Sequence, residues 1–141
     1  MTLIVDTAPL VSLADASEPR RDAVLAALRD EDGPLILPAP ATAEIDYLLG
    51  SRFAPGAREA FLSDLASGRF TIVCLELGDY ATIVDLDRRY SDLGLGLVDC
   101  SAIILAARYR TRRILTFDER HFRAVAPLDG GVFTILPADA E

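Results

Sequence analysis

The 141-residue sequence contains no lysine and no tryptophan, and all 14 of its basic residues are arginines. The missing lysine excludes receiver domains and haloacid-dehalogenase-type phosphatases, because both classes need a lysine to neutralise a phosphoryl group. A P-loop nucleotide site is excluded as well, since the lysine and the glycine pattern of that motif are both absent. No serine has a histidine partner in a nucleophile-elbow context, which argues against a serine hydrolase.

Other absences concern the surroundings of the protein. No apolar run approaches the ~20 residues of a membrane helix, and Asp6 interrupts the first apolar stretch, so we expect no signal peptide and no membrane association. The only two cysteines, Cys74 and Cys100, match no metal motif and predict small buried thiols in a cytoplasmic protein. The net charge of −8 argues against a protein that binds nucleic acid over its whole surface.

Apolar runs alternate with helix-like patterns along the whole chain, and no linker, repeat or low-complexity tract interrupts them. This alternation predicts one α/β domain spanning residues 1–141, with a parallel sheet flanked by helices. Strands are expected at Leu3–Val5 and within PLILPAP, RFTIVCL, RRILTFD and GGVFTILP. Helices are expected at Ala8–Asp15, around 23–28, at Ala41–Leu49 with an end at Gly50, at Arg58–Leu65, at Asp79–Tyr90 and around 98–109.

Four acidic residues lie where a charge is costly or where a ligand crevice is expected. Asp6 and Asp118 each end a predicted strand, and ligands of open α/β sheets bind beyond the carboxyl ends of the strands. Glu44 and Asp99 begin predicted helices beside runs that should be buried. Taken singly, each acid also has a simpler interpretation, as a turn residue or as a favourable charge at the start of a helix.

Several carboxylates at one sheet edge repel one another by about 4 kcal/mol per pair at 4 Å and an effective dielectric of 20. Such a cluster requires protonation of some members or a hard cation between them. Oxygen ligands without histidine or cysteine favour Mg²⁺ or Mn²⁺. The chemistry that follows is metal-assisted hydrolysis of a phosphodiester.

The same residues carry a resemblance to a known family. Asp6 and Thr7 after the first strand, Glu44 in AEIDYLL, Asp99 in LGLVDCSAI, and ILTFDERHF with Thr116 and Asp118 resemble the PIN-domain ribonucleases. More narrowly, the chain resembles the VapC-type toxins of bacterial toxin–antitoxin modules. The resemblance implies a PIN-like parallel sheet of four or five strands, a Mg²⁺ or Mn²⁺ cofactor and cleavage of an RNA substrate, often tRNA or rRNA. It also implies a homodimer and a cognate VapB-type antitoxin that covers the active site.

The resemblance also assigns roles by position. Asp6, Asp99 and Asp118 are expected to bind the metal, and Glu44 to complete the catalytic set with a second ion or water. Supporting hydroxyl hydrogen bonds are expected from Thr116 and Thr7, although Thr7 is equally consistent with a helix N-cap.

Other residues carry weaker expectations. Arg112 and Arg120 are the candidates for RNA contact, chosen from an arginine cluster around Asp118. His121, the single histidine, is expected to be structural, and Asp46 and Asp92 to be solvent-facing or capping acids.

Two alternatives to a toxin stay open at this point. One is a catalytically idle PIN module that serves only as a protein-binding partner, which need not bind Mn²⁺. The other is a PIN nuclease that acts in RNA maturation or on DNA ends, outside any toxin system.

Overall fold

The computed structural model describes residues 1–141 and contains one sheet of five parallel strands in the order β3-β2-β1-β4-β5. The strands are β1 (Leu3–Val5), β2 (Leu35–Pro38), β3 (Thr71–Val73), β4 (Arg113–Leu115) and β5 (Thr134–Leu136). The predicted α/β class and parallel sheet are therefore confirmed.

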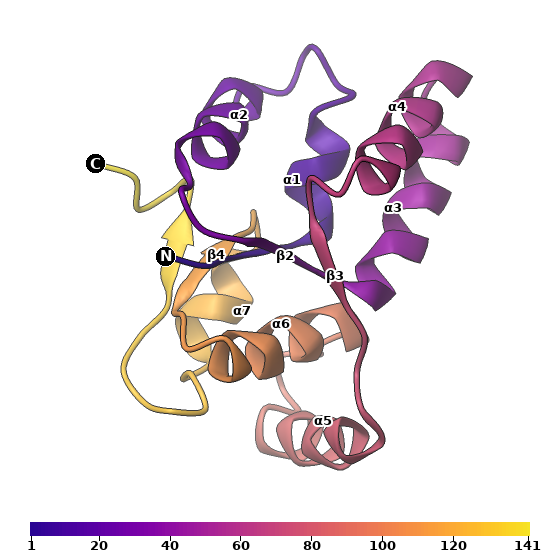
Figure 1. Cartoon of the computed structure of the whole chain (residues 1–141). Helices are drawn as coiled ribbons and strands as arrows, with labels where there is room; N and C mark the ends of the chain where they lie inside the picture. Colours follow the sequence, from indigo (N-terminus) through magenta and orange to yellow (C-terminus); the bar gives the residue numbers. More distant parts are fainter.

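Seven helices cover the two faces of this sheet (Figure 1). Four of them lie on one face: α1 (Thr7–Ser12), α2 (Arg21–Asp30), α3 (Ala39–Arg52) and α4 (Pro55–Ala66). The other face carries α5 (Leu77–Arg89), α6 (Leu97–Arg108) and α7 (Glu119–Ala124). None of the helices combines the length and the apolar character that a membrane span requires.

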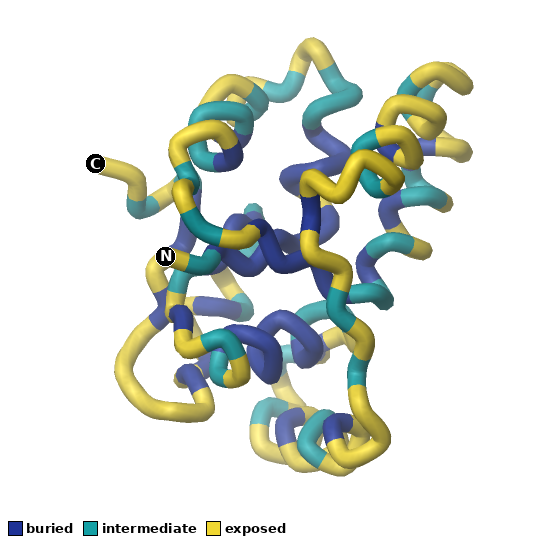
Figure 2. Tube along the Cα trace, in the orientation of Figure 1, coloured by how far each residue is buried: buried dark blue, intermediate teal, exposed yellow.

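The strand sequence explains why both faces are covered. Successive side chains of a strand point to opposite faces, and all three residues of β1 are apolar and fully buried. Leu3 and Val5 belong to the core under α1–α4, whereas Ile4 belongs to the core under α5–α7. Figure 2 shows the central strands and much of α6 as buried, while α4 and α5 expose their outer sides.

Several predicted helix boundaries and one burial prediction are wrong. Helix α1 ends at Ser12 rather than Asp15, and α4 begins at Pro55 rather than Arg58. Helix α3 starts at Ala39 because a proline, here Pro40, is tolerated in the first helical turn, and it continues through Gly50 to Arg52. Helix α7, which follows Asp118, was not predicted at all. Cys74 is exposed after the edge strand β3, whereas Cys100 is buried as expected.

The strand order determines where the functional residues meet. The chain proceeds from β1 outward to β2 and β3, and then crosses to β4 on the other side of β1. The order therefore reverses between β1 and β4, and such a switch point leaves a crevice beyond the carboxyl ends of the two strands. Asp6 follows β1 directly, and Asp118 lies three residues beyond the end of β4.

Candidate metal centre

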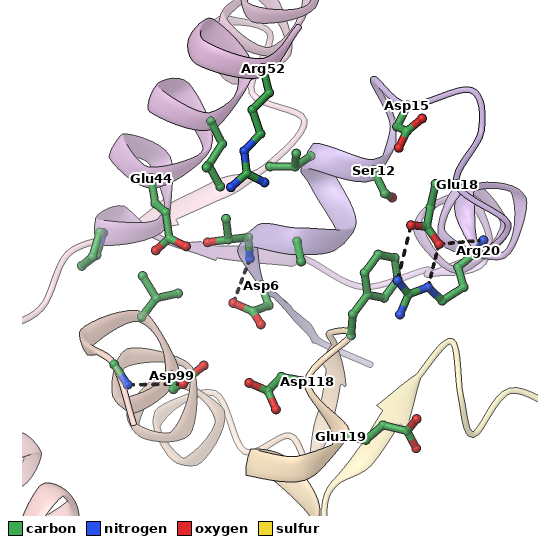
Figure 3. A pocket seen from close by; sticks show the side chains of 18 of the residues that line it. Asp6, Ser12, Asp15, Glu18, Arg20, Glu44, Arg52, Asp99, Asp118 and Glu119 are labelled. Carbon is green, nitrogen blue, oxygen red and sulfur yellow. Dashed lines mark hydrogen bonds and ion pairs between the residues drawn. The ribbon is translucent and has the colours of Figure 1, made fainter. Parts of the chain in front are cut away.

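All four predicted acids line one cleft of about 990 Å³ at this switch point. Figure 3 shows the carboxylates of Asp6, Asp99 and Asp118 pointing toward a shared space, with Glu44 above them on α3. The structure thus brings together side chains from β1, α3, α6 and the β4–α7 connection. Acids that are up to 112 positions apart in sequence become neighbours.

Asp6 is the most buried of these acids, with only 7% of its surface exposed. Its carboxylate accepts a hydrogen bond from the Thr7 N–H (2.8 Å) and another from the Thr116 hydroxyl (2.7 Å). The first bond makes Asp6 the N-cap of α1. The predicted alternative that Thr7 caps this helix is therefore wrong, because Thr7 is its first residue.

Burial raises the pKa of Asp6 from 3.8 to about 6, and the charges of Asp99 and Glu44 add to the increase. The two hydrogen bonds act in the opposite direction and favour the ionised form. The ionised form of Asp6 is thus costly in the folded protein, and its carboxylate lies outside the group of ligand atoms that are all within 4.8 Å of one another, those of Asp99, Asp118 and His121.

Thr116 connects Asp6 to Asp118. Its Oγ1 accepts a hydrogen bond from the Asp118 N–H (3.0 Å) while its hydroxyl donates to Asp6. Since Thr116 is buried within the sheet edge, this bridge fixes the backbone of one acid against the side chain of the other. Asp118 in turn accepts from the His121 N–H (3.0 Å) and caps α7.

His121 is the site residue that the sequence analysis set aside as structural. Its Nδ1 lies 2.9 Å from Asp99 Oδ2 and 2.8 Å from Asp118 Oδ2. Its Nε2 lies 2.9 Å from the Leu93 carbonyl oxygen, and an Nε2–H that donates to this carbonyl leaves Nδ1 directed at the acids. The i, i+3 spacing of Asp118, the N-cap of α7, and His121 in the first turn brings the two side chains together, but only because α7 forms there.

The donors present fit a divalent cation. Ligand atoms of Asp99, Asp118 and His121 all lie within 4.8 Å of one another, and adjacent ligands of an octahedral ion are about 3 Å apart at the metal–oxygen distance typical of Mg²⁺. The buried Thr7 Oγ1 lines the same cleft and has no hydrogen-bond partner in the protein. Buried polar atoms are normally satisfied, so this unpartnered hydroxyl indicates a further ligand in the cleft, and the hydrogen bond to the acids that was predicted for it is absent.

The remaining acids behave as expected. Asp46 faces away from the cleft and forms an ion pair with Arg58 (2.5 Å), and Asp92 is exposed. Glu44 is exposed as well, but it lines the cleft opposite Asp6.

The arginines divide into two groups. Arg52 and Arg120 line the cleft and form no ion pair within the chain, so their charges face the solvent and any ligand there. Arg112 precedes β4 and lies near Asp129 (3.8 Å) at the opposite edge of the sheet, so its selection as an RNA contact is corrected. Arg52 was missed because α3 was predicted to end before it.

A cluster of carboxylates beyond the carboxyl ends of the central strands places the chain among the α/β proteins with an acidic cleft at the switch point of a parallel sheet. The family model of the PIN domain matches residues 3–127 of the chain. The chain therefore belongs to the PIN-domain family, and the predicted resemblance is confirmed.

One sequence relative supports this assignment, and two solved structures are similar to the chain in fold. Ribonuclease VapC26 of Mycobacterium tuberculosis is 36% identical over 135 residues, which cover 96% of this chain and 100% of that protein. The crystal structure of VapC20 of M. tuberculosis, a sarcin–ricin loop cleaving toxin, matches with a TM-score of 0.75 and 15% identity over 83% of this chain and 90% of that one. FitAcB from Neisseria gonorrhoeae matches with a TM-score of 0.64 and 18% identity over 94% and 96% of the two chains.

Proposed function

We propose that the protein is a metal-dependent endoribonuclease of the VapC type, which hydrolyses RNA phosphodiester bonds and so arrests translation. The observation that carries this proposal is the convergence of Asp6, Glu44, Asp99 and Asp118 in one cleft. A Mg²⁺ or Mn²⁺ ion bound there supplies a Lewis acid and an activated water. The similarity to Ribonuclease VapC26 supports RNA as the substrate class.

The proposed roles follow from the surroundings of each side chain. Asp6, Asp99 and Asp118 hold the cation, and His121 directs the lone pair of Nδ1 at the same place, beside the last two acids, as a further donor. Glu44, which is exposed on the other wall of the cleft, binds a second ion or orients water.

We propose that the basic side chains of the cleft bind the substrate. Arg52 and Arg120 line the cleft and form no ion pair within the chain, so their positive charge is available to the phosphate groups of an RNA. Thr116 positions Asp6 and Asp118 without contacting the substrate.

We further propose that a VapB-type antitoxin restrains the enzyme. A cleft rich in carboxylates, in a chain with a net charge of −8, is complementary to a partner that inserts a basic side chain. The similarity to VapC-named toxins supports such a module. A homodimer in the cytoplasm completes the proposed biological form.

The test is RNA cleavage by the protein co-expressed with its genomic neighbour and then purified free of it. Total bacterial RNA is incubated with the protein and Mg²⁺, Mn²⁺ or EDTA, and cleavage sites are mapped by end sequencing. We expect discrete cuts that require a divalent cation and that disappear in Asp99→Asn. Asp22→Asn is the matched control, because Asp22 is also an acid in the first turn of a helix but lies exposed on α2 outside the cleft.

The outcomes separate the competing functions. Cleavage that persists in Asp99→Asn and in EDTA contradicts the metal mechanism. A folded protein that neither binds Mn²⁺ nor cleaves any RNA points to the idle module instead. Metal-dependent cleavage without growth arrest in the cell favours a role in RNA maturation.

A further inference from the structure

One end of the cleft holds a stacked pair of side chains that the metal centre does not use. The guanidinium carbon of Arg20 lies 3.7 Å from the centre of the Phe117 ring. Both residues line the same cleft as the four acids, and Phe117 directly precedes Asp118. Arg20 comes from the segment before α2, nearly a hundred positions earlier, so the pair is formed only by the fold.

The charge of Arg20 is already neutralised. Its Nε donates to Glu18 Oε1 (2.7 Å) and its Nη2 to Glu18 Oε2 (3.3 Å), which makes a two-point ion pair. Glu18 also accepts from the Arg20 backbone N–H (3.2 Å). These bonds hold the guanidinium plane in one orientation, as Figure 3 shows for the labelled pair, while half of the Arg20 side chain stays exposed.

A planar, neutralised guanidinium with one face on an aromatic ring is poorly suited to bind a phosphate. Its other face is suited to a flat aromatic ligand, and proteins stack unpaired bases of single-stranded RNA on arginine planes and aromatic rings. Arg52 and Arg120 differ in this respect, because they form no ion pair within the chain and keep their full charge for phosphates.

We propose that Arg20, stacked on Phe117 and fixed by Glu18, forms a binding site for one unstacked nucleobase of the RNA substrate. The inference rests on the proposed ribonuclease function and deepens it, because it assigns a single-stranded or looped segment as the substrate class. Phe117 directly precedes Asp118, so this base site lies in the same cleft as the proposed cation site.

The test compares two fluorescein-labelled probes of equal charge: a 12-nucleotide oligoadenylate RNA and the same backbone without bases. Affinities of the full chain are measured by fluorescence anisotropy in Ca²⁺, an oxygen-seeking cation that neutralises the acids. We expect the wild type to prefer the oligomer with bases by about 10-fold, in the range of one base stack.

The decisive variant is Arg20→Lys, which keeps the positive charge and a similar side-chain length but lacks the planar guanidinium group. It should bring the ratio of the two affinities close to 1 while leaving the affinity for the abasic oligomer and the salt dependence unchanged. Phe117→Leu should do the same by removing the support of the plane. Arg29→Lys is the matched control, since Arg29 is exposed on α2, is paired with Asp30 and lies outside the cleft.

Other results overturn the base site. If Arg20→Lys lowers the affinity for both probes equally, and Arg20→Ala reduces the salt dependence of binding, then Arg20 contacts a phosphate. If the ratio of the two affinities is unchanged in Arg20→Lys, the ion pair of Arg20 with Glu18 is structural. If the variant loses only its binding to the antitoxin, Arg20 is a protein contact. A wild type that cleaves RNA with metal but shows no preference between the probes refutes the base site and leaves the ribonuclease proposal intact.

Discussion

The high pKa of Asp6 makes a quantitative prediction about stability. Folding raises this pKa from 3.8 to about 6, mainly through burial. The folded protein therefore binds the Asp6 proton more tightly than the unfolded chain, so the contribution of Asp6 to stability is fully present below pH 3.8 and is lost as the pH rises through about 6. A pKa difference of about 2 corresponds to a loss of about 3 kcal/mol in the free energy of unfolding at neutral pH. Roughly half of that loss applies at pH 5.

Asp6→Asn removes this penalty, because the amide does not ionise. In EDTA at pH 7.5 we expect the variant to be more stable than the wild type by about 1–3 kcal/mol. The gain stays below the full penalty because the amide nitrogen that replaces one carboxylate oxygen does not accept the bond from Thr116. At pH 5 the advantage should shrink by about half.

Urea unfolding at both pH values, with EDTA or with MnCl₂, measures this difference. Mn²⁺ should stabilise the wild type, because a cation that binds only the folded state raises its stability, and should have little effect on Asp6→Asn. Asp22→Asn, an exposed acid on α2, controls for the loss of one charge. A variant that is less stable than the wild type in EDTA at pH 7.5, with the same difference at pH 5, would refute the electrostatic reasoning.

Two neighbours of Asp6 and Asp118 give further predictions. Thr116→Val removes the hydroxyl that donates to Asp6 and accepts from Asp118. We expect the free energy of unfolding, measured with urea, to fall by about 2 kcal/mol. A change near zero would show that this hydroxyl bridge does not stabilise the fold. His121→Gln removes the ring between Asp99 and Asp118. We expect Mn²⁺ affinity measured by calorimetry to fall about 10–100-fold, whereas a rise would mean that the imidazole competes with the ion.

The positions of Asp6 and Asp118 were predictable because they depend on local pattern. Each follows an apolar run that has to be a buried strand, and the carboxyl ends of parallel strands meet at one edge of the sheet. Asp99 was predictable for a related reason, since an acid at the start of α6 precedes seven consecutive buried residues, Cys100 to Ala106.

The contacts of His121, Arg52 and Arg20 were not predictable in the same way. The pairing of His121 with Asp118 depends on α7, a six-residue helix that is too short to show a periodic apolar pattern. Arg52 required α3 to continue past a glycine, which packing of α3 against α1 and α4 favours although glycine weakens a helix. The stack of Arg20 on Phe117 is a long-range contact between a loop and the segment after β4, and no local pattern specifies it.

The two kinds of charge in the cleft therefore respond differently to substitution. Asp6 and Asp118 are held by backbone and hydroxyl hydrogen bonds at strand ends, so changes there alter the stability of the fold and the cation site together. Arg52 and Arg120 extend from exposed positions without partners, so their removal should leave the fold intact and weaken only the binding of phosphates. Metal dependence of stability thus reports on the acids, and salt dependence of RNA binding reports on the arginines. The two measurements depend on different residues. A stability that does not respond to metal would contradict the proposed cation site, and a salt dependence of RNA binding that is unchanged in the arginine variants would contradict the proposed phosphate contacts.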